Sequence, residues 1–494
     1  MTLQTPRMHV LSRRGALTLA VAAGFTMTTS VVSWAAPLAA PPAAPPTSAP
    51  AASDARTFSG SLPDGATWTA QVPAAWNGTL LLYSHGYLPS FAGAPNTAQD
   101  APDPTTEAAL LAEGYALTGS SYAAAGWAMN TAVADQLDTL AATTSAMGRP
   151  RRVLAVGTSM GGLVTAKLAE TAGRRIQGAL ATCGIVGGGV ALSNYQLDGA
   201  YTIAQLLAPT QQIPLVRFTG LDQAFATASA LVAAVQQAQT TAEGRARVAL
   251  AAALFQDPSW RPGEPPPTDA DSVEHGQYEW LLKTLQFTVP ARFDIETAEG
   301  GNPSWNAGAD YRDLLSQSVD APTVRTLYRE AGLNLDADLA VLTAGAATTA
   351  DPAAVARMEA TSVPSGRVQM PVLSLHTIAD PLVPVQHENA YRLAVTSAGR
   401  GALLRQAFVA RTDHCTFTPA ELVAAVHALD HRVATGSWQD ATTQRLQQAA
   451  TSLGLGDAAF VPFIPPRLLR EDRHRVAGAG PAPGSQPATA TTGT

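Results

Sequence analysis

The chain has 494 residues, of which 46% are hydrophobic and 14% are charged. This balance is typical of a globular protein with a large core and excludes a chain that is disordered throughout. The formal net charge of −7 gives no basic footprint, so nucleic acid is excluded as an expected partner.

The N-terminal segment has the layout of an export signal. Arg13 and Arg14 precede a modest apolar stretch, and small residues that suit cleavage near Ala35 follow. The arginine pair resembles the twin-arginine export motif. Residues 1–35 are therefore predicted to be a signal peptide, and the mature protein is predicted to be secreted. The apolar stretch is short and interrupted by threonines, whereas about 20 apolar residues are needed to span a bilayer, so no stable membrane anchor is expected.

Low-complexity segments border the folded part of the chain. A Pro/Ala-rich linker is predicted at 36–55 and a disordered tail at 471–494, because neither could build a core. Between them, strands and helices alternate in 56–184 and again in 369–470, which predicts an α/β fold with a mostly parallel sheet flanked by helices. The predicted strands cover 79–86, 115–122, 151–157, 176–184, 370–380 and 402–414, and the predicted helices cover 106–114, 130–148, 160–173, 385–399 and 418–436.

Strand signals fade between the two alternating segments. Residues 185–368 contain Ala-rich helical stretches joined by irregular connections, so they are predicted to form a large helical lid insertion. The segments 56–184 and 369–470 should then complete one sheet and form one core.

Residues 157–161, Gly-Thr-Ser-Met-Gly, match the pattern G-x-S-x-G. The pattern alone is weak evidence in a chain rich in glycine and serine. However, a predicted strand leads directly into it and a predicted helix leaves directly from it, as in the strand-to-helix turn of a nucleophile elbow. Gly157 and Gly161 would allow the backbone to approach closely there. We therefore predict that Ser159 is an exposed nucleophile.

A serine nucleophile needs a base to take its proton and an acid to orient that base. In this architecture the acid and then the histidine follow the serine along the chain. Asp380 and His414 each follow a predicted strand, so both should reach the same carboxyl edge of the sheet as Ser159. The predicted triad is Ser159 as nucleophile, His414 as general base and acid, and Asp380 as the residue that orients the imidazole.

Other candidates near these positions have plainer interpretations. His376 lies inside a strand, which favours a core or supporting role. Asp413 adjoins His414, and neighbours on a strand point to opposite faces, so Asp413 is not favoured as the acid. Three further histidines, which all fall in helical patterns, are expected in solvent: His387, His427 and His431.

The oxyanion of an acyl-transfer intermediate needs hydrogen-bond donors. One is predicted to be the backbone N–H of Met160, directly after the nucleophile. The other is predicted to be the N–H of Tyr87, after the His85-Gly86 turn that ends a strand. One such donor stabilises the transition state by on the order of 3–4 kcal/mol.

The chain contains two cysteines, Cys183 at the end of a predicted strand and Cys415 beside His414. Both map to the catalytic edge of the sheet, and an exported protein can keep a disulfide. We therefore expect a bond between them that braces the His414 loop. Two separate buried thiols are the alternative.

Four strings together resemble the α/β-hydrolase superfamily: HGY (85–87), GTSMGG (157–162), HTIADPLVP (376–384) and RTDHC (411–415). The resemblance implies an eight-stranded, mostly parallel sheet and a serine hydrolase that works through an acyl-enzyme. Within the superfamily the chain resembles secreted bacterial esterases and depolymerase-like hydrolases that contain a lid. The string DHC is also similar to tannases and feruloyl esterases, although Thr158 stands where that group has a cysteine beside the serine.

The favoured hypothesis is a secreted hydrolase of carboxylic esters, small or polymeric, that needs no cofactor and no metal. A secreted peptidase or amidase with the same triad is the first alternative, and a non-catalytic envelope or polymer-binding protein is the second. Tyr122 and Trp127 follow a strand at the catalytic edge, so they are candidate pocket residues, although ordinary packing explains them equally well.

Overall fold

The computed structural model describes residues 55–93 and 95–470. The predicted signal peptide (1–35) and tail (471–494) lie outside the described residues, as does the linker (36–55) apart from its last residue. No helix in the described part of the chain is both long enough and apolar enough to cross a bilayer.

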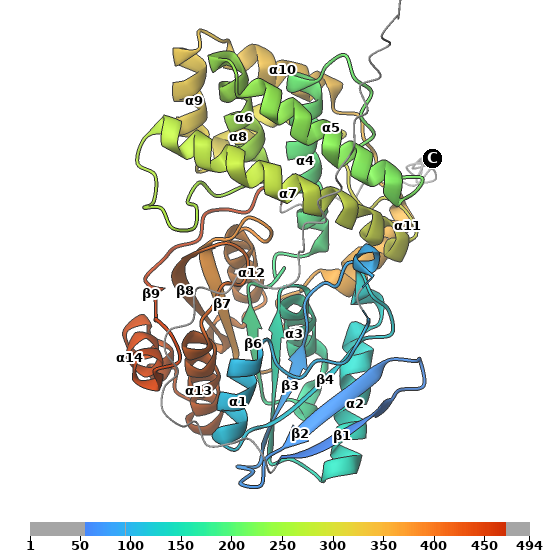
Figure 1. Ribbon diagram of the computed structural model, residues 1–494, viewed down its shortest axis with the longest axis vertical. Helices are drawn as coiled ribbons and strands as arrows, with labels where there is room; N and C mark the ends of the chain where they lie inside the picture. Colours follow the sequence, from blue (N-terminus) through green and yellow to red (C-terminus); the bar gives the residue numbers. More distant parts are fainter. Residues whose placement is uncertain (1–54, 94, 471–494) are drawn as a thin grey trace, which may run out of the picture. The chain divides into compact units, whose positions relative to one another are not determined.

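The described residues contain a nine-stranded sheet in the order β1-β2-β4-β3-β5-β6-β7-β8-β9 (Figure 1). From β4 to β8 neighbouring strands in the sheet are parallel, whereas β1, β2 and β4 pair antiparallel, as do β8 and β9. This arrangement confirms the predicted α/β fold with its mostly parallel sheet flanked by helices. The strands are β1 (Arg56–Ser61), β2 (Thr67–Val72), β3 (Thr79–Ser84), β4 (Ala116–Ser120), β5 (Arg152–Thr158), β6 (Gly178–Thr182), β7 (Val372–Ala379), β8 (Leu404–Thr412) and β9 (Phe460–Val461).

The described sheet has one strand more than the eight that the family resemblance implied. The extra strand, β9, is only two residues long and lies at the edge beside β8. Side chains hold it there: Glu421 accepts a hydrogen bond from the N–H of Ala459, and Gln447 accepts one from the N–H of Phe460. A strand this short has no alternating pattern that the sequence could reveal.

Helices cover both faces of the sheet. Val153 and Ala155 of β5 pack in the cluster of α2, α3 and α12, whereas Leu154 and Val156 pack in the cluster of α1, α13 and α14. This two-sided burial explains why the parallel strands are continuous apolar runs in the sequence. The covering helices are α1 (Pro104–Ala112), α2 (Ala132–Met147), α3 (Met160–Thr171), α12 (Gln386–Ser397), α13 (Pro419–Thr435) and α14 (Thr443–Leu453).

Between β6 and β7 the described chain leaves the sheet and forms a group of helices, drawn in green to yellow in Figure 1. These helices have apolar clusters of their own. One cluster is formed by α4, α5, α6 and α7, and another is formed by α4, α6, α8, α9 and α10. The segment 185–368 is thus helical as predicted, while its definition as a separate lid stays a prediction. The helices are α4 (Gly189–Leu207), α5 (Leu221–Ala238), α6 (Ala242–Phe255), α7 (Ala270–Glu299), α8 (Tyr311–Gln317), α9 (Ala321–Glu330), α10 (Leu335–Gly345) and α11 (Pro352–Ser362).

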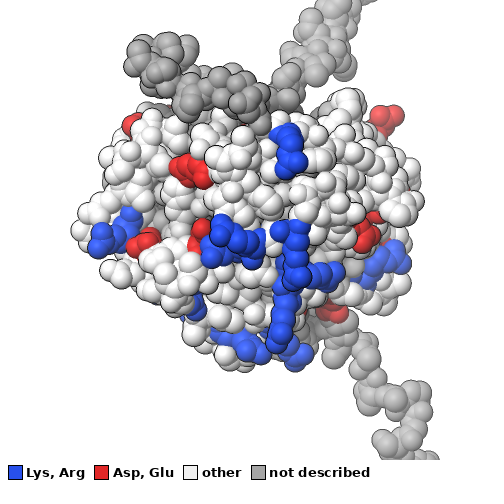
Figure 2. Space-filling model, turned by 90° about the horizontal axis from the view of Figure 1, so that it is seen from below, with Lys and Arg blue, Asp and Glu red and all other residues white. Residues whose placement is uncertain are grey.

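Charged side chains are unevenly distributed over the surface. Figure 2 shows lysine and arginine side chains gathered on the face seen from below, with fewer acidic side chains among them. The formal net charge of −7 therefore does not describe this face of the molecule.

Helix α3 and the end of β3 approach each other closely at Gly161. A Cβ atom added to Gly161 would lie 1.9 Å from the Ser84 carbonyl oxygen and 2.5 Å from the His85 carbonyl oxygen. Both obstacles are backbone atoms, which cannot rotate away as a side chain could. Only glycine therefore lets the helix begin at this position.

Replacing Gly161 with alanine should lower the free energy of unfolding by about 3 kcal/mol, because the backbone has to move apart. Urea unfolding followed by circular dichroism measures this change. Gly401→Ala is the matched control, since a Cβ atom there meets nothing closer than Thr396 Oγ1 at 3.6 Å. Its effect should stay within about 0.5 kcal/mol. Equal stability of Gly161→Ala and the native protein would contradict the close approach.

Candidate active site

Ser159 forms the turn between β5 and α3, with backbone angles φ 60° and ψ −121°. A non-glycine residue with positive φ is uncommon, and such strain costs of order 1–3 kcal/mol. The turn is fixed because the N–H of Ser159 donates to the carbonyl of Thr182, at 2.9 Å, where β6 ends. Ser159 thus has the sharp strand-to-helix geometry of a nucleophile elbow.

The structure brings Ser159, His414 and Asp380 into one hydrogen-bonded chain. His414 Nε2 lies 2.8 Å from Ser159 Oγ, and His414 Nδ1 lies 2.7 Å from Asp380 Oδ2. The three residues follow β5, β8 and β7, so the carboxyl ends of three parallel strands supply them. In this geometry the imidazole can accept the serine proton, although the catalytic roles themselves remain predictions.

The carboxylate of Asp380 is buried, with 1% of the residue exposed. Its Oδ1 accepts hydrogen bonds from the N–H groups of Leu382 and Val383, both at 2.9 Å. Burial by itself would raise the pKa of Asp380, but the charge of His414 and hydrogen bonds from His376 and His414 lower it to about 2. The carboxylate therefore stays ionised at neutral pH and can orient the imidazole.

The loop that carries His414 is held from the side of the helical insertion. Asp413 Oδ1 accepts a hydrogen bond from the backbone N–H of His414 at 2.8 Å, and Asp413 Oδ2 pairs with Lys283 of α7 at 2.6 Å. The backbones of Asp413 and Cys415 on either side of His414 are left-handed, with φ 70° and 57°. Asp413 thus contacts α7 and not the imidazole ring.

Cys183 and Cys415 form the expected disulfide. Cys183 directly follows β6, so the bond ties the His414 loop to the strand beside the elbow. Among the described residues, Cys183, His414 and Cys415 place their possible ligand atoms within 4.8 Å of one another, but the disulfide engages both sulfurs. In this form the group is a brace for His414.

The loop after β3 lies against the elbow. A Cβ atom on Gly86 would come within 3.3 Å of Ser159 Cβ. The next residue, Tyr87, donates a hydrogen bond from its hydroxyl to Asp294 Oδ2 on α7, at 2.6 Å. Burial and the charge of Asp294 raise the pKa of Tyr87, so its hydroxyl keeps its proton. The backbone N–H groups of Tyr87 and Met160 remain the predicted oxyanion donors.

Asp294 is a residue beside the site that the sequence pattern does not single out. Besides the Tyr87 hydroxyl, it accepts hydrogen bonds from the N–H and the hydroxyl of Ser90. It is 5% exposed and is one of several buried polar side chains of the 30-residue helix α7. Only the placement of α7 beside the loop after β3 reveals its role, which is to anchor that loop.

Tyr122 and Trp127 are buried beneath these loops, with 0% and 4% of their surface exposed. The Tyr122 hydroxyl donates to the His85 carbonyl at 3.0 Å, and the Tyr122 ring stacks on the His85 imidazole with centroids 4.1 Å apart. Trp127 Nε1 donates to Glu299 at the end of α7, at 3.1 Å. These contacts support the loop after β3 and the insertion, while a role in a substrate pocket stays a prediction.

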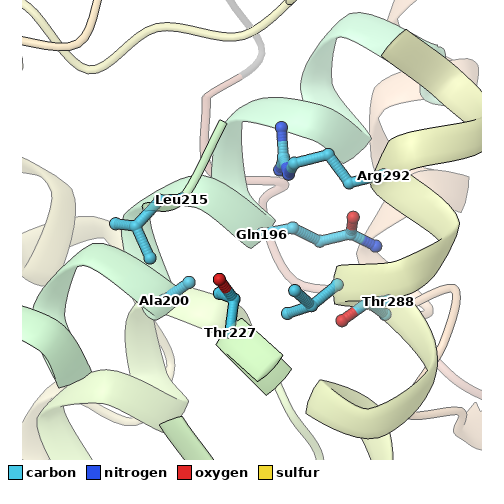
Figure 3. Close-up of a pocket in the computed structure, with 7 residues that line it drawn as sticks. Gln196, Ala200, Leu215, Thr227, Thr288 and Arg292 are labelled. Atoms are coloured by element: carbon cyan, nitrogen blue, oxygen red, sulfur yellow. The ribbon is translucent and has the colours of Figure 1, made fainter. Parts of the chain in front are cut away.

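A small cavity lies within the insertion, between α4, α5 and α7 (Figure 3). Its walls contain neither a triad residue nor one of the two predicted pocket residues. The residues that line it are Gln196, Ala200, Leu215, Thr227, Thr288, Val289 and Arg292.

The expectation that His387 lies in solvent is wrong. The residue is 0% exposed: its Nδ1 accepts a hydrogen bond from the N–H of Gly187 at 3.0 Å, and its Nε2 lies 3.4 Å from the Tyr195 hydroxyl. The start of the insertion covers α12 here, which a helical pattern alone does not indicate. His427 and His431 are partly exposed.

No protein-family model matches the chain. It is similar to the curated o-phthalyl amidase of Xanthobacter agilis, with 28% identity over 431 residues that cover 81% of this chain and 92% of the relative. Among solved structures, feruloyl esterase B from Aspergillus oryzae matches with 13% identity and a TM-score of 0.35, covering 78% of this chain and 81% of its own. An acylaminoacyl peptidase from Pyrococcus horikoshii matches with 9% identity and a TM-score of 0.32, covering 81% of this chain and 40% of its own. Structural likenesses this weak carry no argument for function.

The stability of the protein should depend on the ionisation of Asp380. Because its pKa is lowered from 3.8 to about 2, the group stabilises the fold fully above its unfolded pKa, and this contribution is lost as the pH falls toward 2. Between about pH 5 and pH 3 we expect Asp380 to account for a loss of about 1 kcal/mol in the free energy of unfolding. Urea unfolding at both pH values measures it. The Asp380→Asn variant should lack this component, and an unchanged pH dependence in that variant would count against an ionised Asp380.

Proposed function

We propose that the chain is a serine hydrolase of the α/β-hydrolase superfamily and that it cleaves carboxylic esters through a Ser-His-Asp triad and an acyl-enzyme intermediate. The observation that carries this proposal is the hydrogen-bonded chain from Ser159 through His414 to Asp380. Such a chain makes a serine hydroxyl nucleophilic at neutral pH. Acyl transfer by a triad requires no cofactor.

In acylation, Ser159 Oγ attacks the carbonyl carbon of the substrate while His414 Nε2 takes the serine proton. Asp380 keeps Nδ1 protonated and stabilises the imidazolium that forms. The N–H groups of Met160 and Tyr87 donate to the developing oxyanion. His414 then gives its proton to the leaving oxygen, which departs as an alcohol and leaves the acyl group on Ser159.

In deacylation, water replaces the alcohol. His414 takes a proton from the water as its oxygen attacks the acyl carbon, and the proton then returns to Ser159 Oγ when the carboxylic acid leaves. The insertion contributes to both steps because α7 bonds both neighbouring loops, through Asp294 and Lys283. We therefore place the substrate between the carboxyl edge of the sheet and α7.

An amide substrate is the second candidate, and the relative favours it. The chain is 28% identical over 81% of its length to a protein that is by name an o-phthalyl amidase. The same triad serves esters and amides, because the protonated His414 can deliver its proton to a leaving nitrogen as well as to an oxygen. Amides of aromatic acids, with o-phthalyl amides first, therefore belong in the substrate test.

We also propose that the protein is exported. The Arg13-Arg14 pair and the apolar stretch that follows it support a twin-arginine signal peptide. The Cys183–Cys415 disulfide supports the same destination, since disulfides persist in oxidising compartments.

Ser159→Ala should lower kcat by at least about 10⁴-fold on whichever substrate the enzyme turns over, because the acyl-enzyme can no longer form. The mature protein is assayed on p-nitrophenyl esters of rising acyl length, o-phthalyl amides and aminoacyl anilides. Ser316→Ala, at an exposed position of α8, is the matched control and should keep native rates.

The outcomes separate the candidate functions. Turnover of amides without esters would select the second candidate. Undiminished turnover by Ser159→Ala would remove Ser159 from the mechanism. Absence of turnover together with no labelling of Ser159 by a phosphonate probe would favour a non-catalytic binding protein.

Replacing Arg13 and Arg14 together with lysine should keep the full-length protein in the cytoplasm, because the twin-arginine signal depends on both arginines. Cell fractionation followed by immunoblotting measures the distribution and the cleavage near Ala35. Arg7→Lys, which lies outside the pair, is the matched control and should be exported as the native chain is. Normal export of the double variant would exclude this route.

A further inference from the structure

Behind Asp380 lies a second histidine that the mechanism above does not use. His376 lies in β7 and is 0% exposed. Its Nδ1 lies 3.1 Å from Glu388 Oε1, and its Nε2 lies 2.8 Å from the Val383 carbonyl oxygen and 3.6 Å from Asp380 Oδ2. Oxygen atoms of three residues therefore surround the two ring nitrogens.

Glu388, in the first turn of α12, is also 0% exposed. Its Oε1 faces His376, and its Oε2 accepts hydrogen bonds from Ser374 Oγ and Gln406 Nε2. Hydrogen bonds donated to a carboxylate favour its charged form. Two side-chain donors engage Oε2, while Oε1 faces the imidazole.

The protons on His376 follow from its partners. A backbone carbonyl such as that of Val383 only accepts hydrogen bonds, so Nε2 carries a proton. A hydrogen bond from Nδ1 to Glu388 Oε1 places a proton on Nδ1 as well, and a ring protonated at both nitrogens is an imidazolium. Burial by itself lowers the pKa of His376, but hydrogen bonds and charges of Asp380 and Glu388 raise it to about 10, which agrees with this count.

The charged groups that face His376 are Asp380, in the loop after β7, and Glu388 on α12. His414, in the loop after β8, shares Asp380 Oδ2 from the other side at 2.7 Å. Tyr195 on α4 lies in the field of Asp380, but burial and that charge raise its pKa well above its usual value, so it stays neutral. The relevant charges are therefore two carboxylates and one imidazolium.

We propose that His376 is a positioning residue: as a buried imidazolium between Asp380 and Glu388, it limits how strongly Asp380 attracts a proton on His414. The inference rests on the proposed function, because His376 acts through the Asp380 of the triad. With His376 charged, the three groups carry a net charge of −1, which the protonated His414 neutralises. Without that cation the net charge would be −2, and His414 would hold its proton too tightly to pass it to the leaving group.

The pH profile of kcat/KM tests this coupling, since its acid limb reports the pKa of His414 in the free enzyme. His376→Gln removes the cation and should move the acid limb up by about one pH unit. Adding Glu388→Gln removes one anion as well and restores the net charge of −1. The double variant should therefore return the acid limb to within about 0.3 pH unit of the native position. If His376 had only a structural role, the double variant would have a lower kcat/KM than the single variant, and its acid limb would not return to the native position.

NMR of protein with ¹⁵N-labelled histidine reads the charge of His376 without any turnover. Both ring nitrogens should be protonated from pH 6 to pH 9, and these signals should be missing from His376→Gln. His387→Gln replaces a different buried histidine, which lies in α12 and faces Gly187 and Tyr195. That matched control should leave both the His376 signals and the acid limb at their native positions.

A neutral His376 ring at pH 7 in the native protein would overturn the proposal, even if no variant folds. An acid limb that His376→Gln leaves unmoved, or that the double variant does not restore, would overturn it too. Failure of the proposed function looks different, because Ser159→Ala would then keep its turnover. An inactive Ser159→Ala variant with an unmoved acid limb in His376→Gln rejects only the role of His376.

Discussion

At Ser159 the chain turns from β5 into α3 within a single residue, whose positive φ costs on the order of 1–3 kcal/mol. The turn requires backbone segments to lie almost in contact. A Cβ atom on Gly157 would lie 2.1 Å from the Gly161 carbonyl oxygen, and one on Gly161 would lie 1.9 Å from that of Ser84. The cores on both faces of the sheet hold these segments together. The position of the serine hydroxyl relative to His414 therefore depends on the packing of the whole sheet.

The helical insertion reaches the same site through one helix. Lys283 and Asp294 are about three turns apart on α7, so they lie on the same face of it. Lys283 pairs with Asp413 beside His414, and Asp294 accepts a hydrogen bond from Tyr87 in the loop next to Ser159. Any shift of α7 would displace both loops at once. The insertion and the sheet edge thus form one mechanical unit around Ser159.

Local patterns predicted much of the fold and the meeting of three residues. Apolar runs and glycine stops located the parallel strands, and the order of Ser159, Asp380 and His414 after three strands predicted that they meet at one edge. The features that escaped prediction depend on distant contacts. The hydrogen bond from Tyr87 to Asp294 joins residues 207 positions apart, and the insertion that buries His387 is equally remote from α12. No periodicity in a single sequence records such contacts, because they arise only when separate elements pack together.

The disulfide encloses the helical insertion in a covalent ring, since Cys183 and Cys415 are 232 positions apart and lie on either side of it. Exposed connections between helices are preferred sites of proteolytic cleavage. One cut inside the ring would yield two fragments, one with Ser159 and the other with Asp380 and His414. The disulfide would keep the fragments joined, and β6 of one fragment would still pair with β7 of the other. A nick in the insertion would therefore divide the chain without dividing the site.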